Sequence, residues 1–176
     1  MSRSQLLLIG GRSGVGKTTV AAEVHRQLSE QGVHHAWIEG DNLDMAFPVP
    51  WKQGYRLAED NLAAMWANYK ARGYRRLIYV NTASVAAPVI HELTTAMGDD
   101  PTVTGVLLTS SDTVAEQRLA QREIGGGLAY AVGRSREAAV GLEADAPAEV
   151  VRISTDEPTV PAVAAEIIQL TGWDVK

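Results

Sequence analysis

Residues 10–19 constrain the fold and the chemistry of this chain more than any other stretch of its sequence. From Gly11 to Thr18 they match the pattern G-x-x-x-x-G-K-[ST]. A short apolar run over residues 6–9 precedes the pattern, and a helical pattern over residues 20–28 follows it. Glycines let a loop turn so that backbone N–H groups point inward, and a helix N-terminus adds partial positive charge. The sequence therefore predicts a strand, a phosphate-binding loop (P-loop) and a helix in succession.

This loop predicts a nucleotide site, and we expect ATP and Mg²⁺ to bind there. Lys17 should reach the β- and γ-phosphates, and the hydroxyl of Thr18 should bind the Mg²⁺. The residues expected to contact the nucleotide are Gly11, Arg12, Ser13, Gly14, Val15, Gly16, Lys17, Thr18 and Thr19. The motif alone does not say where the γ-phosphoryl group goes.

The rest of the chain alternates apolar runs with helical patterns, which is typical of an α/β protein with a parallel sheet. Strands are predicted at 6–9, 35–39, 77–80, 103–108 and 150–153, and helices at 20–28, 57–72, 85–97, 113–123, 135–142 and 160–170. With 176 residues, the chain fits one domain over 1–176. We expect the P-loop NTPase fold, with a five-stranded, mostly parallel sheet, helices on both faces and a small lid at about 122–136.

Composition narrows the range of partners. The net charge of −5 argues against nucleic acid, because binding to a phosphate backbone usually requires a basic patch. No cysteine is present, so a thiolate metal site or a cysteine nucleophile is excluded. No apolar run approaches the roughly 18 residues of a membrane span, and the start of the chain is too short for a signal peptide. We expect a cytoplasmic protein that contacts neither membrane nor nucleic acid.

The position of the acidic residues bears on the fate of the γ-phosphoryl group. P-loop proteins that hydrolyse the nucleotide to drive motion or switching carry an acid at the end of an apolar strand to hold Mg²⁺. Here the apolar run at 77–80 is followed by Asn81 rather than an acid. Instead, Glu39 and Asp41 follow the second predicted strand, where alternation along an extended chain puts them on the same side. One carboxylate of such a pair can help to hold Mg²⁺, directly or through water, while the other accepts a proton from an attacking hydroxyl. The alternative is a solvated strand end with Asp41 capping a short helix.

Residues 38–43, Ile-Glu-Gly-Asp-Asn-Leu, resemble the D-G-D-N segment of adenylylsulfate kinases and the D-x-D of shikimate and gluconate kinases. Residues 41–48 are also similar to chloramphenicol phosphotransferase. The chain thus resembles the nucleoside-monophosphate-kinase-like group of small P-loop kinases, and its architecture fits over the whole length. The resemblance implies that Asp41 faces the acceptor hydroxyl. It also implies that Glu39 helps to hold Mg²⁺, directly or through a water molecule, although this chain has Glu where the family pattern has Asp.

Arginines in the second half fit the same resemblance. Arg118 and Arg122 lie four residues apart on a predicted helix and so share a face. In the resembling kinases this region and the glycines after it form a lid whose arginines close over the transferring phosphoryl group, and residues 155–158 lie near the adenine. Arg118 and Arg122 are therefore predicted catalytic residues, and Arg134 is a further candidate. The alternative is a solvent-facing helix whose arginines pair with Glu116 and Glu123.

The acceptor is expected to bind at the irregular stretch 47–61. Trp51, Tyr55 and Arg56 are its candidate contacts, with Asn81 from the next strand end and Asp41. By resemblance to adenylylsulfate kinases, Arg56 would hold an anionic group of the acceptor. The alternative for the two aromatic residues is packing against the core.

These observations favour an ATP-dependent phosphotransferase that moves the γ-phosphoryl group to a small-molecule hydroxyl, with Lys17, Asp41, Arg118 and Arg122 as its catalytic residues. One alternative is a nucleotide kinase with a phosphate acceptor, which needs no base. Another is a nucleotide-binding regulatory ATPase, which should carry a switch loop or a second acid. The acceptor is not identified by the sequence, and neither is the oligomeric state, although the helix at 57–72 could serve a homodimer.

Overall fold

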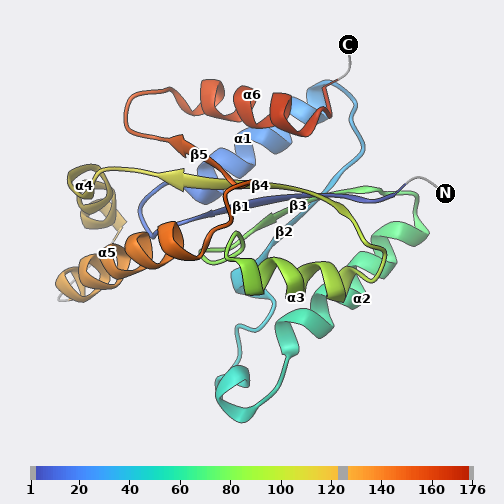
Figure 1. The fold of residues 1–176 in the computed structure, drawn as a ribbon, viewed down its shortest axis with the longest axis horizontal. Coiled ribbons are helices and arrows are strands. Elements are labelled where there is room, and N and C mark those ends of the chain that lie inside the picture. Colours follow the sequence, from blue (N-terminus) through green and yellow to red (C-terminus); the bar gives the residue numbers. More distant parts are fainter. Residues whose placement is uncertain (1–2, 123–126, 175–176) are drawn as a thin grey trace.

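Five parallel strands form the centre of the computed structural model, which describes residues 3–122 and 127–174 (Figure 1). The strands are β1 (Gln5–Gly11), β2 (Ala36–Glu39), β3 (Arg76–Val80), β4 (Thr102–Thr109) and β5 (Val151–Ser154). Their order across the sheet is β2-β3-β1-β4-β5, and every neighbouring pair is parallel. All the strands therefore end at one edge, which is where ligands bind in open parallel sheets.

Helices cover both faces of the sheet. The helices are α1 (Lys17–Glu30), α2 (Leu57–Ala71), α3 (Ala87–Met97), α4 (Asp112–Arg122), α5 (Leu128–Asp145) and α6 (Val160–Thr171), with the short 3-10 turns η1 (Gly40–Asn42) and η2 (Pro50–Gln53). Figure 1 shows α1 and α6 on one face, α2 and α3 on the other, and α4 and α5 beside the end of β4. None of the helices within the described residues has the length and apolar character needed to cross a membrane.

Each face of the sheet buries its own apolar cluster. Val20, Val24 and Leu28 recur at helical spacing in α1 and pack with Ile167 of α6 against one face. On the other face Trp66 of α2 is completely buried, as the sequence predicts. Because helices cover both faces of the sheet, the strands are nearly continuous apolar runs and do not alternate between apolar and polar residues.

The predicted fold class is confirmed, and all five strands lie where they were expected, in a sheet that is wholly parallel. The helix predicted at 135–142 is much longer, because α5 begins at Leu128. Gly133 and Gly141 lie inside this helix and weaken its sequence signal, since glycine disfavours helix interiors. The predicted lid spans the end of α4, residues 123–126, which lie outside the described residues, and the first half of α5.

Candidate functional site

The P-loop leaves β1 and enters α1 through backbone conformations that only glycine adopts easily. Gly16 precedes α1 with φ 99°, and Gly14 has φ 85°. A Cβ atom on Gly14 would lie 2.7 Å from the carbonyl oxygen of Ala115, so even alanine would clash there. The loop is therefore fixed both by its conformation and by the close approach of α4.

The ammonium group of Lys17 folds back over the loop. Its Nζ donates to the carbonyl oxygens of Gly11 at 2.8 Å and of Arg12 at 3.2 Å. Burial, helped by the charge of Arg122, lowers the pKa of Lys17 from 10.5 to about 8, although Asp41 and Glu39 oppose the shift. A bound phosphate would place a negative charge beside this ammonium group and so favour its protonated form.

Glu39 lies beside Thr18 at the end of β2. Burial raises the pKa of the Glu39 carboxylate, and the nearby hydroxyl of Thr18 opposes that shift. The Oε1 atom of Glu39 is buried and has no hydrogen-bond partner among the described residues. A buried carboxylate oxygen and a neighbouring hydroxyl are hard donors of the kind that Mg²⁺ prefers.

Asp41 is held by a side chain from the neighbouring strand end. Asn81 Nδ2 donates to Asp41 Oδ1 at 2.6 Å, and Asn81 Oδ1 accepts from the backbone N–H of Ala83 at 2.9 Å. The second bond fixes which end of the amide faces Asp41. The turn η1 has no side-chain cap, so the alternative of Asp41 as a helix cap is not what the structure shows. Between the two acids, a Cβ atom on Gly40 would clash with the hydroxyl and ring of the buried Tyr79, so this position favours glycine.

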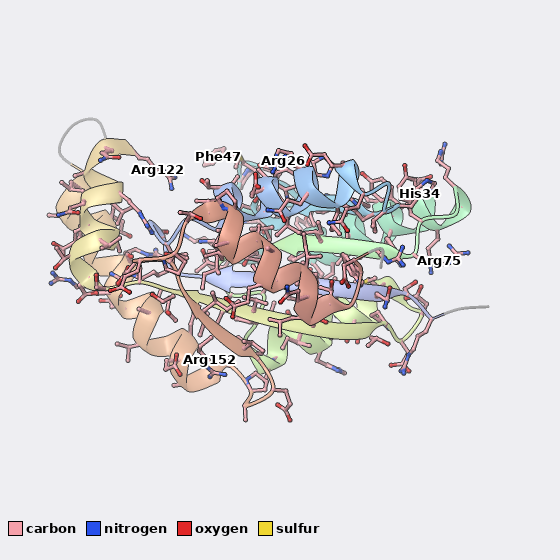
Figure 2. The ribbon with its side chains drawn as sticks, turned by 90° about the horizontal axis from the view of Figure 1, so that it is seen from above. Arg26, His34, Phe47, Arg75, Arg122 and Arg152 are labelled. Atoms are coloured by element: carbon pink, nitrogen blue, oxygen red, sulfur yellow. The ribbon has the colours of Figure 1, made fainter. Side chains whose placement is uncertain are left out.

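A cavity of about 160 Å³ brings the P-loop and both acids together. It is lined by Ser13, Gly14, Gly16, Lys17, Thr18, Thr19, Glu39, Asp41, Thr82 and Arg122. Figure 2 shows Arg122 at the opposite end of the molecule from His34 and Arg75. We call this space the phosphate cavity. Of the four predicted catalytic residues, it gathers Lys17, Asp41 and Arg122.

Arg118 lines a different cavity, of about 150 Å³, between the P-loop and the loop that follows β5. Its guanidinium donates to the carbonyl oxygen of Val15 at 3.1 Å and to Thr155 at 2.9 and 2.8 Å. The remaining walls come mainly from apolar side chains of α1 and α6, among them Val20 and Val163. We call this space the side cavity. It is bounded by Thr155 and Pro158, from the turn that the family resemblance associates with adenine.

Arg12 points out of the back of the P-loop. Its side chain is only 3% exposed, and its Nε donates to Ser135 Oγ at 2.8 Å. Ser135 Oγ in turn donates to the carbonyl oxygen of Ser13 at 2.7 Å, and Arg12 forms an ion pair with Asp112. That ion pair holds the pKa of Asp112 below its usual range. Arg12 is therefore turned away from the phosphate cavity and is not among the residues that line it.

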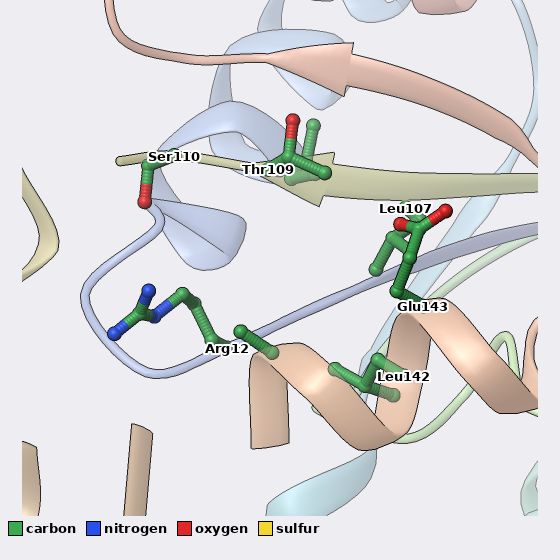
Figure 3. Close-up of a pocket in the computed structure, with 8 residues that line it drawn as sticks. Arg12, Leu107, Thr109, Ser110, Leu142 and Glu143 are labelled. Atoms are coloured by element: carbon green, nitrogen blue, oxygen red, sulfur yellow. The ribbon is translucent and has the colours of Figure 1, made fainter. Parts of the chain in front are cut away.

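Figure 3 shows the space behind the loop, a cavity of about 40 Å³ between β4 and α5. Arg12 and Ser110 face each other there, and Arg12 Nη2 and Ser110 Oγ are buried without hydrogen-bond partners among the described residues. Sequence reasoning did not find the Arg12–Ser135 contact. The P-loop pattern leaves position 12 open, and no local signal pairs residues 123 positions apart.

The predicted acceptor contacts lie on an exposed stretch between η1 and α2. Trp51 and Tyr55 are 65% and 68% exposed, so neither packs against the core. Arg56 is also exposed and lies 3.7 Å from Glu59 in an ion pair. These three side chains are not among those that line the phosphate cavity.

Two arginines of the predicted lid, Arg134 and Arg136 on α5, contact a ring and acids at the surface. Arg134 stacks over Tyr130, with its guanidinium 6.0 Å from the ring centre. Arg136 pairs with Asp112 and with Glu116. Glu116, one of the expected partners for the arginines of α4, thus pairs with α5 instead.

Comparison with known proteins gives one family match. The family described as adenylylsulphate kinase matches over residues 3–50, which is well under half of the chain. The matched segment contains the P-loop together with Glu39 and Asp41. Among curated protein sequences, none matches the chain.

Solved structures resemble the chain over almost its whole length. APS kinase from Mycobacterium tuberculosis, in complex with AMPPNP and APS, has 23% identity and a TM-score of 0.62, covering 97% of this chain and 98% of that one. A gluconokinase from Sinorhizobium meliloti has 19% identity and a TM-score of 0.62, and the Deinococcus radiodurans tunicamycin resistance protein has 20% and 0.65. Both cover 97% of this chain and 96% of their own. The predicted resemblance to small P-loop kinases is confirmed, and the chain has their fold without being assigned to one of these families.

Proposed function

We propose that this protein is an ATP-dependent phosphotransferase that moves the γ-phosphoryl group to a hydroxyl of a small molecule. The observation that carries the proposal is the position of Asp41, which lines the same cavity as Lys17 and is oriented by Asn81 at 2.6 Å. A carboxylate so placed can receive the proton of a hydroxyl that attacks phosphorus.

The residues divide the work of binding. The loop amides and Lys17 would hold the phosphate chain, while the side cavity beside Arg118 would bind the adenine base of the nucleotide. Thr18 and Glu39 would hold Mg²⁺, which fits the buried Oε1 of Glu39, an atom with no hydrogen-bond partner in the described part of the chain. When bound, the ion neutralises charge on the β- and γ-phosphates.

The transfer step then needs little further chemistry. The acceptor oxygen forms a bond to the γ-phosphorus as the bond to the ADP oxygen breaks, and the hydroxyl proton passes to Asp41. Arg122, at the wall of the phosphate cavity, would stabilise the negative charge on the transferring group. Residues 122–136 would act as a lid that excludes water from this step.

Asp41→Asn tests the role of the base. It keeps the shape of the side chain but cannot accept a proton, so kcat should fall by about 10²–10⁴-fold with ATP affinity unchanged. The measurement is acceptor-dependent ADP release across a panel of hydroxyl compounds, with ATP affinity followed by titration. Glu92→Gln is the matched control, because Glu92 is an exposed acid on α3.

Two outcomes would replace the proposal with its alternatives. Full activity of Asp41→Asn towards nucleoside monophosphates would indicate a nucleotide kinase, whose phosphate acceptor needs no base. Slow ATP hydrolysis that no acceptor accelerates would indicate a regulatory ATPase. The absence of an acid after β3, which ends in Val80 and is followed by Asn81, weighs against the second outcome.

A further inference from the structure

Residues 43–56, which we call the arm, expose an unusual amount of apolar surface. Eight large hydrophobic side chains are exposed across the described residues, and half of them lie on the arm. These four are Met45, Phe47, Trp51 and Tyr55, and Phe47 is 96% exposed. Four exposed apolar side chains within eleven residues of one segment are a concentration of the kind that usually marks a binding site. The arm starts directly after the turn that carries Asp41, so it stands at the edge of the sheet where an acceptor must approach.

The charges around the base of the arm are mostly negative. Asp41, Asp44 and Glu59 lie close enough to Tyr79 to add to the burial that raises its pKa to about 12. Asn61 Nδ2 donates to the carbonyl oxygen of Leu43 at 2.6 Å, which ties the beginning of α2, and hence Glu59, to the start of the arm. Asp41 and Asp44 lie on either side of the start of the arm in the chain, so acids predominate there.

The two basic residues of this region are already engaged. Arg56 pairs with Glu59, and Lys52 Nζ lies 5.3 Å from the ring centre of Trp51. Within residues 41–61, all of which the structure describes, no third lysine or arginine is present. Lys17 and Arg122 face the phosphate cavity, where the donor nucleotide would occupy them. An anionic group on the acceptor would thus meet carboxylates rather than cations.

We propose that the acceptor is a neutral or cationic hydroxyl compound with an aromatic or otherwise apolar body, and that the arm covers that body while Asp41 faces the hydroxyl. This inference rests on the proposed function and gives it a substrate class. A second copy of the chain is a poorer occupant. In a two-fold dimer the same patch meets itself, which would bring the acids of both copies together.

Four probes with defined charge test this inference on protein loaded with AMPPNP and Mg²⁺, so that the nucleotide sites are filled. Three share an aromatic ring and a sugar: para-nitrophenyl β-glucoside, which is neutral, the β-glucosaminide, which is cationic, and the β-glucuronide, which is anionic. The fourth, methyl β-glucoside, lacks the ring. Binding is followed by ligand-observed NMR, and the molecular mass of the protein by analytical ultracentrifugation.

The neutral and cationic aromatic probes should bind about tenfold more tightly than the anionic one, because two or three partly exposed carboxylates act on its charge. Methyl β-glucoside should bind least. Trp51→Ala should weaken all three aromatic probes about fivefold, since it removes a stacking surface. Leu170→Ala, an exposed apolar truncation on α6, is the control and should change nothing. Glu59→Gln should narrow the gap between the glucoside and the glucuronide.

Several results would overturn the inference. These are preference for the glucuronide, equal binding of methyl β-glucoside, no binding of any probe, or a dimer that Trp51→Ala converts to monomer. The proposed function fails differently. In that case the probes bind as expected, but no hydroxyl compound receives phosphate from ATP.

Discussion

Replacing Ser135 with alanine should loosen the P-loop from behind. The Ser135 hydroxyl accepts a hydrogen bond from Arg12 Nε at 2.8 Å and donates one to the carbonyl oxygen of Ser13 at 2.7 Å. Both partners belong to the loop, whereas Ser135 belongs to α5. The substitution removes only the oxygen, so its effect reports what this tie contributes.

The magnitude follows from what is left behind. A hydrogen bond from a charged donor contributes about 1.5–3 kcal/mol and a neutral one about 1 kcal/mol, and Arg12 is too buried for water to replace Ser135 freely. The free energy of unfolding should therefore fall by about 3 kcal/mol. With an m-value of about 2 kcal/mol per molar urea, the unfolding midpoint moves down by about 1.5 M. ATP affinity should fall about tenfold, because binding must then order a loose loop.

Urea unfolding and ATP titration measure the two effects. Ser110→Ala is the matched control, since it is the same chemical change in the cavity that Arg12 lines, and Ser110 Oγ has no hydrogen-bond partner among the described residues. It should leave both quantities nearly unchanged. Equal unfolding midpoints for the two variants would refute the reasoning. A lowered midpoint with unchanged ATP affinity would show that the tie stabilises α5 without positioning the loop.

Three further predictions concern Lys17 and Arg118. Because the pKa of Lys17 is about 8 in the free protein and phosphate restores its charge, ATP affinity should fall about tenfold between about pH 7 and about pH 9. Lys17→Arg should remove this dependence in the titration, and a flat wild-type profile would contradict the assignment. The same pKa makes the free fold gain stability from about pH 8 to about pH 10.5, where the unfolded chain binds more protons. Arg118→Ala should weaken ATP about tenfold but tripolyphosphate much less, because Arg118 walls the side cavity while Thr155 still holds the carbonyl oxygen of Val15. Calorimetry measures both ligands, and equal losses would mean that Arg118 acts only by holding the loop.

The sequence predicted those parts of the structure whose signals are local. The P-loop pattern and the buried apolar runs lie within a few residues of one another, so spacing alone located β1, α1 and the strand ends. Glu39 and Asp41 could be placed on one side of β2 by the same short-range logic. Their partners, Thr18 and Asn81, come from other elements and depend on the order of strands in the sheet.

The two arginines of α4 show where local reasoning stops. Arg118 and Arg122 do lie on one helix, but a helix rises about 1.5 Å per residue, so four residues separate them by about 6 Å. That distance is enough to place one at the side cavity and the other at the phosphate cavity. The sequence showed the shared face, and only the packing of α4 against the P-loop and the β5 turn shows which space each one reaches.

The outward-facing carbonyl groups of the loop explain why so many distant residues converge on it. In a planar trans peptide the C=O and the following N–H point in opposite directions, so holding a carbonyl oxygen outward turns the next amide inward. Ser135 holds Ser13, while Arg118 and Thr155 hold Val15. The amides aimed inward by these bonds are those of Gly14 and Gly16, both of which line the phosphate cavity. The motif therefore makes the loop possible, whereas α4, α5 and the β5 turn orient it for an anion before any nucleotide binds.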